Sequence, residues 1–290
     1  MKVLVTGCNG QVGTCLVQQL SKKTEVELFA FDVQDLDITN QEEVAAKINQ
    51  INPQVIINAA AYTAVDKAET DIENSYAINE KGALYLAQAA NKNNALLLHI
   101  STDYVFDGSE QEPYTESVKP NPQSIYGKSK LAGERAVAEN CEKYAILRTS
   151  WVFGNYGNNF VKTMLKLGKD RSELGIIGDQ IGAPTYAGDI AKALITIATK
   201  FSNKEQSGIY NFSGYPYVSW YQFAQHIFNA AKQNKVLENI PQINEITTDQ
   251  YPLPAPRPAN SKLDCRKIKT EFNINPSDWQ TALSNIKAYS

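Results

Sequence analysis

Uninterrupted apolar runs alternate with helix-spaced apolar positions over the first half of the chain. The runs are short and rich in Val, Ile and Leu, as in strands buried on both faces, and they cover Lys2–Thr6, Val26–Phe31, Val55–Asn58, Ala95–Ile100 and Tyr144–Arg148. The segments with helical spacing cover Val12–Leu20, Asn40–Asn49, Asn74–Asn91 and Pro122–Asn140. Strands separated by helices predict an α/β fold with a doubly wound parallel sheet.

The second half of the chain has a less regular pattern. Gly168–Gly188 is rich in glycine and is expected to be mostly loop, whereas Asp189–Lys200 has helical spacing. Ser219 is a suitable N-cap for a long helix that ends near Lys232. Tyr251–Asn260 holds four prolines, which predict an irregular, extended segment.

This change of pattern predicts two lobes. We expect residues 1–150 to form the sheet domain and residues 151–290 to form a smaller α/β lobe that covers the carboxyl edge of the sheet. We expect some segments of residues 151–290 to return to the sheet of the first lobe, so that the two lobes are interleaved in sequence.

Composition and charge exclude several classes of protein. The 290 residues carry a formal net charge of -3, so no broad basic surface is expected and nucleic acid is not a predicted partner. No apolar run approaches the roughly 20 residues of a membrane span. The four cysteines lack zinc-like spacing and only two histidines are present, so we expect no metal site and a cytoplasmic protein with free thiols.

A glycine-rich turn follows the first predicted strand directly. Gly7, Gly10 and Gly13 have the spacing G-x-x-G-x-x-G and open the first helix. Glycine permits a tight turn and lets the backbone approach a pyrophosphate closely, and a helix N-terminus favours anions. The alternative is a turn that merely needs glycine. The position after the first strand of an alternating α/β chain favours a dinucleotide site.

Asp32 ends the second predicted strand, about 20 residues after the glycines. An acidic residue at this place usually accepts hydrogen bonds from the adenosine ribose. It would repel the 2′-phosphate of NADPH, and no Arg or Lys lies near it in sequence, so the pattern favours NADH. The alternative is a solvated strand end.

Tyr126 and Lys130 lie four positions apart in a predicted helix and therefore share a face. An ammonium about 5 Å from a phenol, at an effective dielectric near 20, would lower the phenol pKa by roughly two units. This would bring Tyr126 near the working range of a general acid.

A pair with this spacing is expected about once by chance in a chain of this composition, so its position has to carry the argument. The pair falls in the helix after the fourth strand, and Ser101 and Thr102 close that strand. Hydroxyl groups at the carboxyl end of a strand lie beside the crevice where such sheets bind ligands.

Together these motifs resemble the extended branch of the short-chain dehydrogenase/reductase superfamily. Longer blocks resemble, in order and over nearly the whole chain, the family of dTDP-4-dehydrorhamnose reductases; they are Asn58–Glu69, Ser101–Gly108, Arg148–Phe153, Gly157–Phe160, Asp179–Thr185 and Arg257–Leu263. The resemblance implies a Rossmann-like NAD(P)-binding domain and a sugar-nucleotide-binding lobe.

The resemblance also implies roles for single residues. Tyr126 would donate a proton, and Lys130 would lower its pKa and hold the nicotinamide ribose. Thr102 would bind the 4-keto oxygen of the sugar, beside Asp103, while Trp151 would line the sugar site. The cofactor would lie against Gly7, Gly10, Gln11, Val12, Gly13, Asp32, Asp37, Ile38, Ala61, Tyr62 and Thr63.

For two of the residues assigned to the substrate site, an alternative without a role in binding remains open. Trp151 alone would more often be a core residue than a ligand contact. Arg257, between two prolines, is either a diphosphate ligand or a solvated surface charge.

The implied activity is hydride transfer from NADH or NADPH to C4 of dTDP-4-dehydro-β-L-rhamnose, giving dTDP-L-rhamnose. An alternative is another sugar-nucleotide reductase, dehydratase or epimerase of the same branch, but dehydratases typically have Asp-Glu after the threonine, where this chain has Asp103-Tyr104. A second alternative is a non-catalytic subunit like the regulatory subunit of methionine adenosyltransferase. Some members of the family are magnesium-linked dimers; Thr14-Cys15-Leu16 provides no carboxylate there, so we expect no Mg²⁺ and a monomer or weak homodimer.

Overall fold

A parallel sheet of six strands forms the centre of the molecule. The computed structural model describes all residues from 1 to 290, and the sheet has the order β10-β5-β4-β3-β1-β2. Its strands are β1 (Lys2–Thr6), β2 (Glu27–Phe31), β3 (Val55–Asn58), β4 (Leu96–Thr102), β5 (Tyr144–Thr149) and β10 (Gly208–Asn211). All neighbouring strands pair in parallel, so the predicted doubly wound sheet is confirmed.

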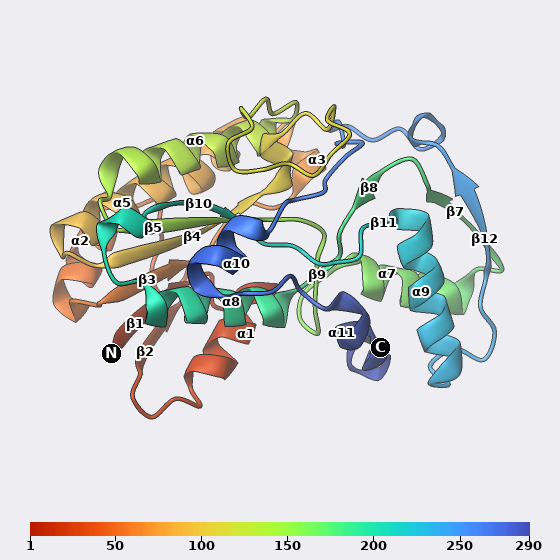
Figure 1. Cartoon of the computed structure of the whole chain (residues 1–290), viewed down its shortest axis with the longest axis horizontal. Coiled ribbons are helices and arrows are strands. Elements are labelled where there is room, and N and C mark those ends of the chain that lie inside the picture. The colour runs from red at the N-terminus through yellow and green to blue at the C-terminus, as the bar shows by residue number, and fades with distance from the viewer.

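Helices cover both faces of this sheet, as Figure 1 shows. One face packs against α1 (Gln11–Leu20), α8 (Ala187–Lys200) and α10 (Arg266–Phe272). The other face packs against α2 (Gln41–Ile51), α5 (Ala83–Lys92) and α6 (Ile125–Asn140). Strands enclosed in this way must be apolar on both faces, which explains the uninterrupted apolar runs in the sequence.

The strand order reverses between β1 and β3, because the chain runs from β1 outward to β2 and then returns to the other side of β1. Ligands of open α/β sheets bind in the crevice at such a switch point, beyond the carboxyl ends of the strands. The glycine-rich turn follows β1, and the segment Ala59–Thr63 follows β3, so both lie at this crevice.

The predicted single helix over Asn74–Asn91 is interrupted in the structure. It consists of α4 (Ile72–Tyr76), a π-helical turn over Ala77–Gly82, and α5. The continuous pattern gave no sign of the interruption. The π-helical turn carries Asn79, which is 1% exposed and bonds to the segment after β3, and such turns are frequent at functional sites.

The second lobe has its own small core. Helices α7 (Phe160–Asp170) and α9 (Trp220–Gln233) pack together with β7 (Glu173–Ile177), which pairs in parallel with β12 (Gln242–Ile246). Ser219 caps α9 through a capping box with Gln222, as the predicted N-cap requires. The lobe also contains β6 (Val152–Phe153), β8 (Ile181–Gly182), β9 (Thr185–Tyr186), β11 (Val218–Ser219) and α11 (Trp279–Ser284).

The prediction of a mostly irregular Gly168–Gly188 was wrong, since this stretch contains the end of α7 and the strands β7, β8 and β9. Its glycines reflect close packing rather than turns. A Cβ atom on Gly182 would lie 2.5 Å from Cε2 of Trp151, and one on Gly175 would lie 3.3 Å from Ile246.

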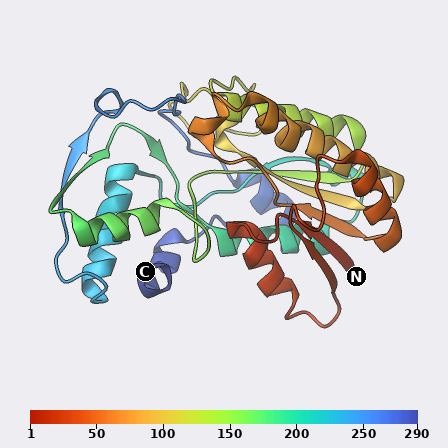
Figure 2. The same cartoon turned by 180° about the vertical axis from the view of Figure 1, so that it is seen from behind.

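The chain crosses between the lobes several times. After β9 it returns to the sheet as α8 and β10, forms α9 in the second lobe, and comes back through the proline-rich segment to α10. Figure 2 shows the N-terminus at the sheet and the C-terminus in the smaller lobe. No helix has the length and apolar character needed to span a membrane.

Candidate active site

The glycine-rich turn leaves no room for side chains at two of its three glycines. Gly7 has φ +65°, and a Cβ atom on it would lie 2.6 Å from the backbone nitrogen of Ala60. A Cβ atom on Gly13 would lie 2.0 Å from the carbonyl oxygen of Gly7. Gly10 is the N-cap of α1 and has no side-chain cap, so the first N–H groups of the helix are open to an anion.

A cleft of about 610 Å³ continues from this turn along the carboxyl ends of β1, β2 and β3. It is lined by Gly7, Asn9, Gly10, Asp32, Val33, Leu36, Asp37, Ile38, Thr39, Ala59, Ala60, Ala61, Asn74, Ala77 and Ile78. The cleft therefore brings together three segments that the sequence predicted one by one: the glycine turn, the end of β2 and the segment after β3. The bare turn and the cleft fit the pyrophosphate and adenosine of a dinucleotide.

Two carboxylates, and no Arg or Lys, lie among these lining residues. Asp32 accepts hydrogen bonds from the backbone nitrogens of Asn9 (3.0 Å) and Val33 (2.9 Å), so it also fixes the glycine turn. Asp37 accepts from the backbone and side chain of Thr39. The arrangement is unfavourable for a phosphate on the adenosine ribose.

A buried polar cluster joins the cofactor side to helix α6. The side chain of Asn79 accepts from the backbone nitrogen of Tyr62 (2.9 Å) and donates to its carbonyl oxygen (3.1 Å). The same amide donates to Ser129 (2.9 Å), whose hydroxyl lies 2.9 Å from that of Ser75 and also bonds to the Tyr126 carbonyl oxygen. Asn79 therefore fixes the segment that contains Ala61, Tyr62 and Thr63 relative to helix α6.

Tyr126 and Lys130 lie in the first turns of α6, which Ser124 caps by accepting from Gly127. Both side chains are buried, with exposed fractions of 9% and 2%. Burial raises the pKa of Tyr126 to about 12, although a hydrogen bond with Thr102 acts in the opposite direction. Burial lowers the pKa of Lys130 to about 8, and the Glu134 carboxylate opposes that shift.

These values correct the expectation that Lys130 brings the Tyr126 phenol towards neutral pKa. The Lys130 ammonium donates to the carbonyl oxygen of Ile100 at 2.7 Å. Loss of water around the phenol disfavours the phenolate, and this effect dominates its pKa. Tyr126 is therefore held in its protonated form.

Thr102 and Asp103 lie beside Tyr126 at the carboxyl end of β4. The Thr102 hydroxyl donates to Asp103 at 2.9 Å and accepts from the backbone nitrogen of Tyr104. Asp103 is 3% exposed, and burial raises its pKa to about 6 even though hydrogen bonds from Ser261 and Thr102 favour its ionised form.

A buried ion pair between Arg148 and Glu134 lies next to the carboxyl end of β4. Arg148 donates to both carboxylate oxygens of Glu134, at 2.8 and 2.6 Å, and Ser101 donates to the same carboxylate at 2.5 Å. The pair ties α6 to β4 and β5, so helix α6 and the strand that ends in Thr102 are fixed together.

Trp151 stands between the two lobes in a strained conformation. Its backbone has φ +48°, a region that a bulky residue rarely adopts. Its ring packs over Gly182 and stacks on Trp220, with ring centroids 3.6 Å apart. The ring packs against the core of the second lobe, and these contacts hold the strained backbone in place.

Arg257 reaches from the proline-rich segment to the first lobe. Its guanidinium donates to both carboxylate oxygens of Asp66, which lies in α3 (Val65–Ala68), at 2.7 and 2.6 Å. A small hollow next to it is lined by Tyr104, Phe106, Asp107, Gln123, Ser124, Pro256, Arg257 and Pro258. The Tyr104 ring packs edge-on against that of Tyr126, with centroids 5.4 Å apart.

Seven of the residues predicted to contact the cofactor do not line the cleft: Gln11, Val12, Gly13, Tyr62, Thr63, Tyr126 and Lys130. Sequence reasoning also missed Asp66, Asn79 and Trp220. The only available signal for Asp66 was its place in the block Asn58–Glu69. Their roles come from tertiary contacts over long sequence separations, which no local pattern encodes.

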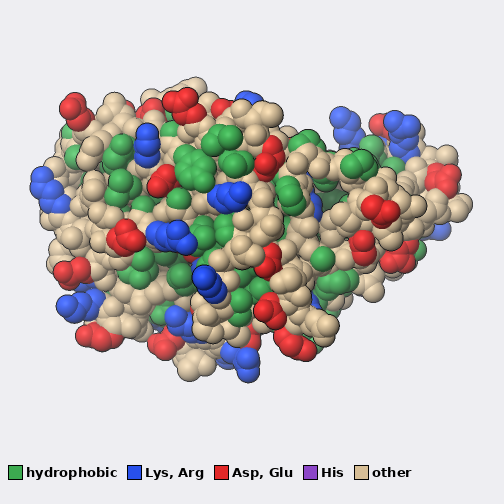
Figure 3. Space-filling view, turned by 90° about the horizontal axis from the view of Figure 1, so that it is seen from above, with side chains coloured by type: hydrophobic (Ala, Val, Ile, Leu, Met, Phe, Trp, Pro, Cys, Tyr) green, Lys and Arg blue, Asp and Glu red, His purple; other side chains and the backbone are tan.

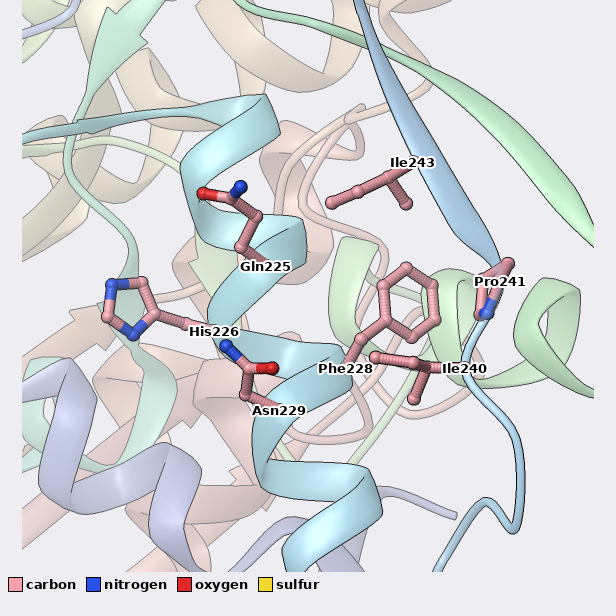
Figure 4. Close-up of a pocket in the computed structure, with 7 residues that line it drawn as sticks. All are labelled: Gln225, His226, Phe228, Asn229, Ile240, Pro241 and Ile243. Atoms are coloured by element: carbon pink, nitrogen blue, oxygen red, sulfur yellow. The ribbon is translucent and has the colours of Figure 1, made fainter.

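A second hollow, of about 430 Å³, lies on the second lobe between α9 and β12. Figure 4 shows Phe228, Ile240 and Ile243 gathered on one side of α9, while His226 points to the other side. It contains none of the candidate residues. Figure 3 shows Lys, Arg, Asp and Glu side chains interspersed over the upper face of the molecule.

Comparison with protein families gives one match over nearly the full chain. A family model described as RmlD substrate binding domain matches residues 1–289. A dTDP-4-dehydrorhamnose reductase of Aggregatibacter actinomycetemcomitans is 53% identical and the match covers 100% of this chain and 99% of the relative. One from Escherichia coli K12 is 40% identical, with 99% and 97% covered.

Solved structures agree with this match. A dTDP-4-dehydrorhamnose reductase from Clostridium acetobutylicum has TM-score 0.92 and 41% identity, covering 99% of this chain and 98% of its own. One from Bacillus anthracis, in complex with NADP, has TM-score 0.91 and 39% identity, covering 100% and 99%. A UDP-glucose 4-epimerase from Thermus thermophilus, at 20% identity and TM-score 0.79, shares the fold.

Proposed function

The chain belongs to the family of dTDP-4-dehydrorhamnose reductases, and from that premise we propose that it reduces dTDP-4-dehydro-β-L-rhamnose to dTDP-L-rhamnose with NADH or NADPH. The observation that carries the proposal is that Thr102, Tyr126 and Lys130 are all buried where the end of β4 meets the first turns of α6. A family match alone would also admit a chain that had lost its catalytic groups.

The cofactor site consists of the turn from Gly7 to Gly13, the two carboxylates Asp32 and Asp37, and the segment after β3. When bound, the reduced nicotinamide supplies the hydride that C4 of the sugar accepts. Asp32 favours NADH, because its carboxylate is placed where a ribose hydroxyl would donate and a 2′-phosphate would be repelled.

Tyr126 supplies the proton that the new alkoxide oxygen requires. A phenol whose pKa is raised to about 12 is protonated at neutral pH and can donate. Thr102, whose hydroxyl lies beside the Tyr126 phenol, polarises the 4-keto oxygen. The Lys130 ammonium, held by the Ile100 carbonyl oxygen, would stabilise the phenolate that forms when Tyr126 gives its proton to the alkoxide.

The substrate lies on the opposite side of the cleft, between residues 1–150, which bind the cofactor, and residues 151–290. Trp151 faces the sugar, with Asp103 beside its reacting carbon. Arg257 contributes to binding of the diphosphate.

We also propose that the enzyme works in the cytoplasm as a monomer or weak homodimer, without magnesium and without nucleic acid. The four cysteines are free thiols, which proteins in a reducing compartment retain. The net charge of -3 gives no general attraction to nucleic acid.

The test is to mix the full chain with dTDP-4-keto-L-rhamnose and either NADH or NADPH, and to follow the absorbance of the reduced nicotinamide. We expect one cofactor oxidised per sugar reduced. An epimerase or dehydratase would change the sugar without net cofactor oxidation, and a non-catalytic subunit would change neither; either outcome would refute the proposal.

A further inference from the structure

One edge of the Arg257 guanidinium, between Nε and Nη2, is bound by no protein group. Nη1 donates to Asp66 Oδ1 and to the carbonyl oxygen of Ala255, both at 2.7 Å, and Nη2 donates to Asp66 Oδ2 at 2.6 Å. The backbone nitrogen of Ala255 donates to the same Asp66 carboxylate at 3.2 Å. Asp66 therefore binds both the side chain and the backbone of the proline-rich segment.

Three of the five guanidinium N–H bonds are used in this way. The two that remain are the Nε–H and the second Nη2–H, which point in parallel from the adjacent edge of the plane. This edge has the fork geometry that binds two oxygens of a phosphate at once. Because Asp66 holds the other edge, the plane cannot rotate about its long side chain without breaking two charge-assisted hydrogen bonds.

Arg257 lies near Tyr126, the proposed proton donor, with Tyr104 between them. Arg257 is 16% exposed and lines the same small hollow as Tyr104, whose ring contacts Tyr126. Asp66 is more open, at 39%. The neighbouring acidic group, Glu69, is committed to the first turn of α6, where it accepts from the Ile125 backbone nitrogen at 2.8 Å.

We propose that Asp66 is a positioning residue that aims the free Nε–Nη2 edge of Arg257 at the diphosphate of the sugar nucleotide. The inference rests on the proposed function, since it takes a nucleoside diphosphate as the ligand. Asp66 itself does not touch the substrate; it acts through Arg257 and keeps the proline-rich segment against the first lobe.

The opposite role for Asp66 makes a different prediction. If Asp66 only neutralised Arg257 and competed with the diphosphate, removal of its charge would tighten anion binding. If Asp66 orients the guanidinium, removal weakens binding, because the side chain then has to be ordered by the ligand. The direction of the change therefore decides between the two roles.

The test measures binding of dTDP, thymidine and inorganic pyrophosphate to the full chain by calorimetry, in the wild type and in Asp66→Asn. The asparagine keeps the shape of the side chain but presents an NH₂ to one arm of the guanidinium. We expect dTDP and pyrophosphate to bind about 10-fold more weakly and thymidine to bind as before. Asp66→Glu, which retains the carboxylate, should recover part of the loss.

Steady-state kinetics give an independent measurement. The KM for dTDP-4-keto-L-rhamnose should rise by about the same factor in Asp66→Asn, with kcat and the KM for NADH within about twofold. A general loss of structure would lower kcat and the melting temperature as well. Asp264→Asn is the matched control, because it breaks an Asp–Arg pair with the exposed Arg266, away from the site.

Unchanged or tighter dTDP binding in Asp66→Asn would overturn the positioning role. A wild-type chain that does not bind dTDP would instead refute the proposed function. Equal losses in Asp66→Asn and Asp264→Asn would also overturn the inference, because the effect would then belong to any ion pair.

Discussion

The proposed site has a cofactor side and a substrate side, and the two are built in different ways. The cofactor side comes from segments close in sequence, and its central feature is the absence of side chains: a Cβ atom on Gly13 would lie 2.0 Å from the Gly7 carbonyl oxygen. The substrate side depends on pairs of side chains far apart in sequence. Asp66 and Arg257 are separated by 191 positions, and Trp151 stacks on Trp220 from another segment of the chain.

This difference determines how each side responds to mutation. A backbone cradle is damaged when atoms are added, whereas removal of a nearby side chain leaves its N–H groups in place. A site made of paired side chains is damaged when one partner is truncated, because the other loses its orientation. Tyr126 lies between the two sides, so we expect its mutation to impair the reaction and to leave binding of cofactor and substrate nearly unchanged.

The largest effect is expected for Tyr126→Phe. The change removes only the proton-donating hydroxyl, and general acid catalysis contributes roughly 10²–10⁴-fold to a rate. We expect kcat to fall within that range, with the KM for NADH and the affinity for dTDP nearly unchanged. Near-normal turnover by pure protein would remove Tyr126 from the reaction, and a large loss of cofactor affinity would place it on the cofactor side alone.

The next effect should separate the two sides. Arg257→Ala removes a charge-assisted contact to phosphate worth about 1.5–3 kcal/mol, so the KM for the sugar nucleotide should rise roughly 10- to 100-fold. The KM for NADH should stay within a factor of about two. Calorimetry with free dTDP checks the assignment, and equal affinities in wild type and variant would make Arg257 a partner of Asp66 and nothing more.

The same contrast explains what could be predicted from the sequence. The glycine spacing, Asp32 and the alternating strands and helices are local patterns, and they placed the sheet and its crevice correctly. Trp151 and Arg257 came from resemblance to a family. The Asp66–Arg257 pair, the stacking of Trp220 on Trp151 and the π-helical turn around Asn79 depend on packing between distant segments. A pattern with a period of two or 3.6 residues contains no information about such contacts.

The pKa of Tyr126 could not be predicted for a related reason. A charge four residues away is visible in the sequence, but the extent of burial is not. In the structure, burial of the phenol is the dominant influence, and the Lys130 ammonium is bound to the Ile100 carbonyl oxygen.

A smaller effect is expected for Asp32→Ala on the cofactor side. The change removes the carboxylate that would repel a 2′-phosphate, so the ratio of kcat/KM for NADPH to that for NADH should rise about tenfold. It also removes the acceptor for the Asn9 backbone nitrogen, so kcat/KM for NADH should fall as well. An unchanged ratio in the variant would mean that Asp32 does not face the adenosine ribose.

The smallest expected effect is on stability and concerns the substrate side. Burial raises the pKa of Asp103 to about 6 from its ordinary 3.8. The folded state therefore binds more protons than the unfolded state between about pH 4 and 6, and stability falls as pH rises through that window. Asp103→Asn removes the buried charge but can still accept from Thr102, so we expect the melting temperature at pH 7.5 to increase by about 2–4 °C.

Asp107→Asn provides a control of opposite sign, only four residues away. Hydrogen bonds from the backbone and side chain of Ser109 hold the pKa of Asp107 down at about 2, so its ionised form stabilises the fold above about pH 4 and loses that contribution as pH falls towards 2. Scans of melting temperature against pH should show Asp103→Asn above wild type at neutral pH, with the gap closing below about pH 4. The Asp107→Asn variant should lie below wild type at neutral pH. A melting temperature of Asp103→Asn at or below that of wild type at pH 7.5 would mean that the buried carboxylate of Asp103 carries no cost in stability.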